Sequence, residues 1–368
     1  MTNERVVFID YLRVIACFMV MLVHSCEPFY LGGEGTLILN RTNGVIVTLI
    51  DSLLRPCVPL FVMASSYLLF PIKGECCEFF RKRFKRVAIP LIIWVLLYAL
   101  IPLYGSTYEF YKSGSVLNSL KQSIFNFPGA AGHLWFVYML LGIYLVMPIF
   151  SAWIEKVSKK GEQCFILLWL FTTTIPFLRL LSGGNQVWGE ANWNEFGLFY
   201  GVSGFIGYVI LAHYFRKYLS DLSWKKTILI SIPLIIIGYS ISAGWFWNTM
   251  PKEFPVESTI DLAVYMETGW GFCTSGTALI TIGFFLIIKK LNGDNAFYRH
   301  FILPISGASY GMYLMHIFFL CFFTTVFQNA INSTLLVIFL TALCSYGTSF
   351  AVSYLLGRVP KLGKYIVG

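Results

Sequence analysis

Four ionisable side chains lie inside an apolar run near the start of the chain. The run covers residues 8–28 and contains Asp10, Arg13, His24 and Glu27. At about 100° per residue, the step from Arg13 to His24 is three helical turns plus about 20°, so both lie on one face of a helix. A rise of about 1.5 Å per residue separates them by roughly 16 Å, about half of the ~30 Å hydrocarbon core. Such groups are costly in lipid, so the pattern predicts one wall of an internal polar site.

Two further histidines strengthen the case for chemistry at this site. His133 and His316 lie at or within other apolar runs. A neutral imidazole can take a proton from a hydroxyl, and a carboxylate such as Glu27 or Asp51 can orient it. A single buried histidine is more often a hydrogen-bonded packing residue. Three at one depth, with charged neighbours, favour a functional cavity.

Other polar residues are expected at the depth of His24. Asp51 and Arg55 stand at positions i and i+4, a spacing that favours an ion pair on a helix. The sequence therefore predicts a substrate site that draws on ten residues: Asp10, Glu27, Asp51, Arg55, His133, Trp135, Arg179, Glu267, Tyr313 and His316.

A cationic segment follows the second apolar run. Six lysine and arginine residues lie between positions 73 and 86. Positive charge that fixes membrane orientation explains part of this segment. Arg83 and Arg86, with Arg81 and Lys82 beside them, also suit a multiply phosphorylated ligand, because guanidinium groups bind phosphate through paired hydrogen bonds. From the residues alone, both interpretations stay open.

Composition places these residues in a membrane protein. The 368 residues are 57% hydrophobic and 12% charged. We expect a single all-α polytopic domain over residues 1–368, with about ten transmembrane helices. The first apolar run keeps its charges and lacks a small-residue cleavage pattern, so it is interpreted as a true span and not as a signal peptide. The expected spans are 8–28, 44–71, 87–104, 133–153, 164–182, 196–213, 227–246, 267–288, 303–323 and 334–357.

Loop charges predict the orientation of these spans. With the N-terminus inside, the inner segments carry 20 lysine and arginine residues and the outer segments carry 4. Both termini are therefore expected to be cytoplasmic, with Arg13 nearer the cytosol and His24 nearer the outside. The net charge of +9 follows mostly from this bias, so nucleic-acid binding is not needed to explain it. The nine scattered cysteines form no C-x-x-C pair, and we expect no metal site and no disulfide framework.

Several motifs resemble the acyltransferase family 3 membrane proteins. Arg13 and His24 match the family's Arg/Lys-x10-His motif, and RFKR (83–86) matches its Arg-x-x-Arg motif. RPCVPLFVMASSYLLF (55–70) is similar to the second-span signature, with Ser65-Ser66 where Ser-Gly is more usual. HLWFVYMLLGIYLVMP (133–148) and SYGMYLMH (309–316) also resemble stretches of the family's standalone members, which modify polysaccharides.

The resemblance implies a bacterial cytoplasmic-membrane enzyme that works across the bilayer. It implies transfer of an acyl group, expected to be acetyl, from cytosolic acetyl-CoA to a sugar hydroxyl of an envelope glycan or its lipid-linked precursor. His24 would be the catalytic base or an acyl relay and Arg13 its motif partner. Arg81, Lys82, Arg83 and Arg86 would contact coenzyme A. The expected partners are acyl-CoA, the glycan acceptor and membrane lipid, and a homodimer stays open.

Three alternatives remain at this stage. An O-succinyltransferase of the same type is the nearest, because Arg55 or Arg179 could hold a second carboxylate. A transporter or flippase of an anionic glycan intermediate also suits buried charges, although it needs no fixed phosphate clamp on one side. A scaffold without chemistry would require all three outer histidines to be dispensable. The oxyanion donor is also open, with Arg55, His133 and Tyr313 as candidates.

Overall fold

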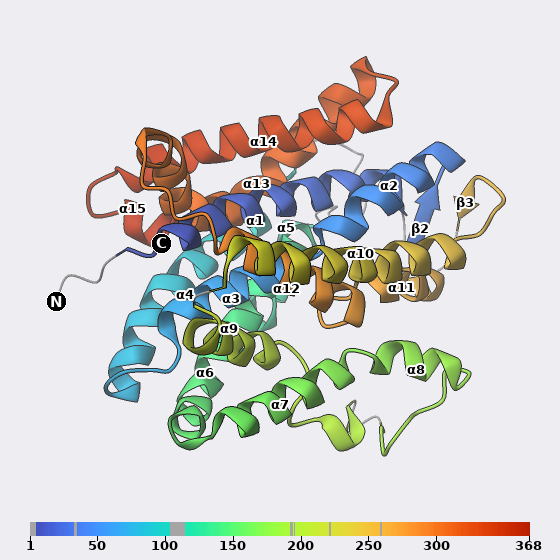
Figure 1. Ribbon diagram of the computed structural model, residues 1–368. Coiled ribbons are helices and arrows are strands. Elements are labelled where there is room, and N and C mark those ends of the chain that lie inside the picture. Colours follow the sequence, from blue (N-terminus) through green and yellow to red (C-terminus); the bar gives the residue numbers. More distant parts are fainter. Residues whose placement is uncertain are drawn as a thin grey trace.

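The computed structural model describes residues 5–32, 35–103, 115–191, 194, 196–220, 222–257 and 260–368. These residues are helical almost throughout (Figure 1). The α-helices are α1 (Val7–Cys26), α2 (Arg41–Leu54), α3 (Cys57–Leu69), α4 (Cys76–Leu100), α5 (Val116–Phe125), α6 (Trp135–Lys156), α7 (Lys159–Thr172), α8 (Ile175–Leu181), α9 (Ile206–Tyr218), α10 (Trp224–Thr249), α11 (Ile260–Glu267), α12 (Ser275–Ile288), α13 (Leu303–Ala330), α14 (Thr334–Gly357) and α15 (Gly363–Ile366). Short helical turns are η1 (Glu27–Phe29), η3 (Gly129–Leu134), η4 (Gly197–Phe199), η5 (Thr268–Trp270) and η6 (Tyr298–Ile302), and the strands are β1 (Leu31–Gly32), β2 (Gly35–Ile38) and β3 (Val256–Glu257).

The helices confirm an all-α polytopic membrane protein. Within the described ranges, eight helical stretches are long and apolar enough to cross a membrane: Val7–Phe29, Arg41–Leu69, Val116–Lys156, Lys159–Leu181, Trp224–Thr249, Asp261–Ile288, Tyr298–Ala330 and Thr334–Gly357. The two other expected spans, 87–104 and 196–213, are not among these eight stretches. The expected span 87–104 begins inside α4, whose first turns carry the cationic segment. The expected span 196–213 is helical mainly from Ile206 onward, because α9 has only 13 residues.

One expected span is divided. The stretch 44–71 forms α2 and α3, which separate at Arg55 and Pro56. Proline has no backbone N–H to continue a helix, so the chain can change direction there. The break lets Arg55 stand at the C-terminal end of α2 beside Asp51, where the backbone N–H of Arg55 also bonds the Asp51 carbonyl.

Helix α1 has a central position in the bundle. It contacts α2, α3, α12, α13 and α14, and a dozen of its residues are buried. Figure 1 shows α1 between the α13–α14 pair and the α3–α12 side of the molecule. Because α1 has helices on several sides, polar groups along it can face protein instead of lipid.

The two ends of the bundle differ. The start of α1, the start of α4 and the C-terminal helix α15 lie at one end in Figure 1, and β2, β3 and α8 lie at the other. The first end carries the cationic segment of α4, and the second carries a small antiparallel sheet in the order β1-β2-β3. We refer to them as the α15 end and the sheet end. The start of α1 and the C-terminal helix α15 therefore lie on the same side of the bundle.

Candidate active site

Three histidines from three helical segments meet at one level of the bundle. His24 lies two residues before the end of α1, His133 lies in η3, and His316 lies in α13. The ring centroids of His24 and His316 are 5.1 Å apart, and those of His133 and His316 are 4.9 Å apart. The prediction that these histidines share one depth is confirmed. We call His24, His133 and His316 the histidine cluster.

His24 forms a close pair with a carboxylate. Its Nδ1 lies 2.7 Å from Glu27 Oε1, and both side chains are mostly buried. The pair forms because the chain continues from α1 into η1, which keeps Glu27 three residues on and on the same side. A carboxylate accepts a hydrogen bond from Nδ1–H, and in the neutral form of the ring the other nitrogen, Nε2, is then the basic one.

The other two histidines have fixed tautomers. His133 Nε2 lies 3.4 Å from the Leu314 carbonyl oxygen, and His316 Nδ1 lies 2.6 Å from the Tyr313 carbonyl oxygen. A carbonyl oxygen only accepts, so both of these nitrogens carry hydrogen. The remaining nitrogens, His133 Nδ1 and His316 Nε2, are buried acceptors without a partner among the described residues.

A charged group lies beside the histidine cluster. Arg55 Nη2 donates to Asp51 Oδ2 at 2.6 Å and to Tyr30 Oη at 3.1 Å, which confirms the expected Asp51–Arg55 pair. The Arg55 guanidinium also lies over the Trp270 ring, 4.7 Å from its centroid. Glu267 interacts with Tyr30 and Arg55, and Glu27 is near enough to interact with both Asp51 and Glu267. We call this group, together with the histidine cluster and Glu27, the polar layer.

Two of the proposed oxyanion donors are already occupied. Tyr313 donates its hydroxyl to the His133 carbonyl, and the N–H of His133 points to the Leu314 carbonyl. Arg55 keeps a donor at Nε, because this buried atom has no partner in the described part of the chain. Of the three candidates, Arg55 is the one with an available N–H.

A second group of cations lies on the α15 side of the polar layer. Arg13, Arg83 and Arg86 all interact electrostatically with Tyr144, whose hydroxyl bonds Ser65. Arg83 is half-buried and Arg86 is exposed. The described residues give none of the three arginines an ion pair or a hydrogen bond. An unpaired set of guanidinium groups is a suitable binding site for phosphate.

The remaining cations of the segment are oriented differently. Arg81 and Lys82 are exposed, and Lys82 pairs with Glu78 at 2.6 Å. Ser66, which stands where the resemblance predicts glycine, fits into α3 by donating to the Val62 carbonyl at 2.8 Å. The departure from Ser-Gly is therefore accommodated within the helix.

Asp10 belongs to a separate network. Arg5 donates to both of its oxygens, at 2.7 and 3.0 Å, and Tyr298 and Ser306 donate at 2.8 and 2.5 Å. Fourteen residues of α1 separate it from His24, or about 21 Å. Its hydrogen-bonding capacity is used, so the geometry does not support the expectation that Asp10 lines the substrate site.

Two other expected site residues also pack elsewhere. Trp135 stacks on Phe272, with ring centroids 5.3 Å apart, and also contacts Phe205. Arg179 donates through Nε to Glu190 at 3.2 Å and through Nη2 to its other oxygen. This hydrogen bonding holds the pKa of Glu190 below its usual value.

Sequence reasoning missed several residues of the two groups. Tyr30 and Trp270 contact Arg55, and Tyr144 interacts electrostatically with the α15-side arginines, yet none of these three residues was singled out. Tyr144 lies inside a stretch that resembled the family, which was a usable signal. The buried pair of His213 Nδ1 and Glu162 Oε1, 2.7 Å apart, gave no such signal, because 51 residues separate the partners.

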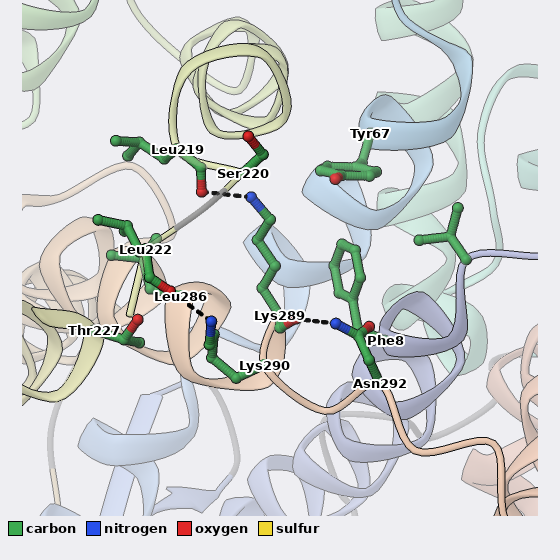
Figure 2. A pocket seen from close by; sticks show the side chains of 11 residues that line it. Phe8, Tyr67, Leu219, Ser220, Leu222, Thr227, Leu286, Lys289, Lys290 and Asn292 are labelled. Atoms are coloured by element: carbon green, nitrogen blue, oxygen red, sulfur yellow. Dashed lines mark hydrogen bonds between the residues drawn. The ribbon is translucent and has the colours of Figure 1, made fainter. Parts of the chain in front are cut away.

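The cavity shown in Figure 2 is distant from the histidines. It holds about 260 Å³, and Phe8, Leu219, Lys289 and Asn292 are among its lining residues. Phe8 lies sixteen residues before His24, or about 24 Å along α1. Lys289 and Lys290 donate to backbone carbonyls at and just beyond the end of α9, at 2.5–2.8 Å. Their ammonium groups therefore satisfy backbone carbonyls that the helix leaves without a donor. We assign this cavity no part in the chemistry.

Comparison with known proteins identifies the family to which the chain belongs. A family model described as an acyltransferase domain matches residues 6–358, which is nearly the whole chain. No curated protein and no solved structure matched. Among the described residues, no group of three or more His, Cys, Asp or Glu side chains is arranged to hold a metal ion.

Proposed function

We propose a specific activity from the premise that the chain belongs to the acyltransferase family whose model matches residues 6–358. In this proposal, the protein moves an acetyl group from cytosolic acetyl-CoA to a hydroxyl of an envelope glycan or its lipid-linked precursor. The transfer crosses the bacterial cytoplasmic membrane, with the α15 end in the cytosol. The observation that carries the proposal is the His24–Glu27 pair, held at 2.7 Å inside the histidine cluster.

His24 acts as the general base in this proposal. Glu27 holds Nδ1–H, so Nε2 takes the proton from the acceptor hydroxyl as its oxygen attacks the thioester carbonyl. The new C–O bond forms and the C–S bond breaks. The imidazolium then returns the proton to the departing thiolate, so atoms and charge balance. Arg55 Nε is the available N–H for the developing oxyanion.

The α15-side arginines bind the donor in this proposal. In the described structure, no carboxylate lies within ion-pair distance of Arg13, Arg83 or Arg86, although Asp10 attracts Arg13 from farther away, so phosphates of coenzyme A can pair with them. The pantetheine arm then extends along α1 for the roughly 16 Å between Arg13 and His24. In this proposal, the arginines bind the phosphates and His24 acts at the thioester, so the two sites lie at different depths.

The geometry favours acetyl over the alternatives. The succinyl alternative needs a guanidinium for the second carboxylate, but Arg55 pairs with Asp51 and Arg179 with Glu190. A transporter does not need the tautomer control that Glu27 gives to His24. We therefore retain acetyl transfer as the proposal.

The test compares His24→Ala with His300→Ala, an exposed histidine outside the cluster. Each variant is returned to cells that lack the protein, and acylation of envelope glycans is measured by mass spectrometry. We expect the His24 variant to insert normally and to lose glycan acylation, and the His300 variant to retain it. Unchanged acylation in the His24 variant would contradict the assignment of the base.

A further inference from the structure

Most of the unsatisfied polar atoms in the polar layer are hydrogen-bond acceptors. Four of them accept hydrogen bonds: Glu27 Oε2, Asp51 Oδ1, His133 Nδ1 and His316 Nε2. One donates, Arg55 Nε. All five are buried and lack a partner among the described residues. A ligand that fills this layer must therefore supply more hydrogen-bond donors than acceptors.

These atoms are distinct from the other unsatisfied groups of the described chain. Outside the layer, the unpartnered buried atoms are six serine and threonine hydroxyls and Glu162 Oε2. A hydroxyl in a helix can turn to its own backbone carbonyl at little cost. A carboxylate or a basic imidazole nitrogen has no such local donor. Their concentration around His24 points to a ligand and not to general packing.

The charged groups of the polar layer are mostly negative, which also favours a ligand that donates hydrogen bonds. Among the described residues, Arg55 is the cation that Glu27, Asp51 and Glu267 face, and the histidines contribute no charge when neutral. Three carboxylates against one guanidinium leave a net charge of −2, and −1 remains if one carboxyl is protonated. Like charges repel strongly at short range where water is scarce. A substrate that carries a permanent negative charge next to the reacting group is therefore disfavoured beside His24.

We propose that this layer selects the charge of both substrates: an uncharged or cationic, hydroxyl-rich sugar as acceptor, and an uncharged acyl group. Hydroxyl and ammonium groups supply the donors that Glu27, Asp51 and the histidines lack. Sugars with a carboxylate or phosphate on the accepting residue, and dicarboxylic acyl groups, are rejected. The inference rests on the proposed acyltransferase function and adds the substrate class.

The first test needs no variant. Envelope glycans from cells with and without the protein are compared by mass spectrometry, and the acylated residue and the acyl group are identified. We expect a neutral acyl group on a residue that carries neither carboxylate nor phosphate. A succinyl group, or acylation of an anionic residue, overturns the inference but leaves the proposed function intact. No acylation difference, together with no binding of coenzyme A, overturns both.

The second test measures charge selection directly. The full-length protein is placed in nanodiscs with unacylated glycan from deletion cells, and CoA release is followed with acetyl-CoA or succinyl-CoA. We expect Glu267→Gln to narrow the preference for acetyl by about tenfold, because one repelling charge is lost. Asp261→Asn, an exposed change on the same helix α11, is expected to leave the preference unchanged. An unaltered preference in a folded Glu267 variant overturns the electrostatic explanation.

Discussion

Replacing Glu27 by glutamine tests how much the negative charge of Glu27 stabilises the His24 imidazolium. Glutamine keeps the shape of the side chain, and its carbonyl can still accept the Nδ1–H bond now seen at 2.7 Å. Both side chains are well under a third exposed, so their interaction is not strongly screened. Two unit charges about 4 Å apart at an effective dielectric of about 20 interact by about 4 kcal/mol.

This interaction is present only when His24 carries the transferred proton. It therefore stabilises the transition state and not the neutral resting ring. A loss of about 3–4 kcal/mol corresponds to a fall in kcat of about 100- to 1,000-fold. The KM for acyl-CoA should change little, because the donor phosphates bind elsewhere in the proposal. We expect Glu27 to act as a positioning residue with this kcat-specific signature.

The assay is CoA release by the purified protein, with acyl-CoA and glycan varied separately. Asp261→Asn serves as the matched control, since it removes an exposed carboxylate. A kcat within about threefold of the unmodified protein would refute the reasoning. A rise in the KM for acyl-CoA without a change in kcat would instead place Glu27 in donor binding.

Two further predictions concern the other charged groups. Arg83→Ala and Arg86→Ala should each weaken coenzyme A binding by about tenfold or more, and less so at high salt; Lys82→Ala, which removes a cation already paired with Glu78, should have a small effect in the same titration. The hydrogen bond from Arg179 lowers the pKa of Glu190 in the folded protein. The pair should therefore stabilise the loop fully at pH values above the pKa of Glu190 in the unfolded chain, about 4.3. This stabilisation should be lost as the pH falls towards the pKa of Glu190 in the folded protein. Hydrogen exchange of residues 182–191 checks this, and a loop whose protection does not decrease on acidification would contradict it.

Local spacing was enough to predict part of the site. The Arg13–His24 stripe and the Asp51–Arg55 pair follow from helical periodicity, which is a property of one segment. Hydropathy and loop charge also predicted a polytopic helical bundle with both termini on one side. The expected span 196–213 was wrong in its first half, because apolar composition there belongs to loops and η4 that precede α9.

Asp10 shows the limit of such reasoning. Its position beside the Arg13–His24 stripe suggested a place in the substrate site. Its oxygens are instead filled by Tyr298 and Ser306, which lie almost 300 residues away in the sequence. No local pattern reports which distant donor will reach a carboxylate, because this depends on how helices pack.

The sequence by itself determined the class of protein and the face of α1 that carries ionisable groups, and it predicted one common depth for His24, His133 and His316. Only the tertiary structure decided that His133 and His316 approach His24, and that carbonyl oxygens fix their tautomers. It also decided that, within the described ranges, Arg55 keeps a donor at Nε whereas the Tyr313 hydroxyl donates to the His133 carbonyl. Hydropathy and periodicity act along one helix, but hydrogen-bond saturation depends on neighbours from other helices.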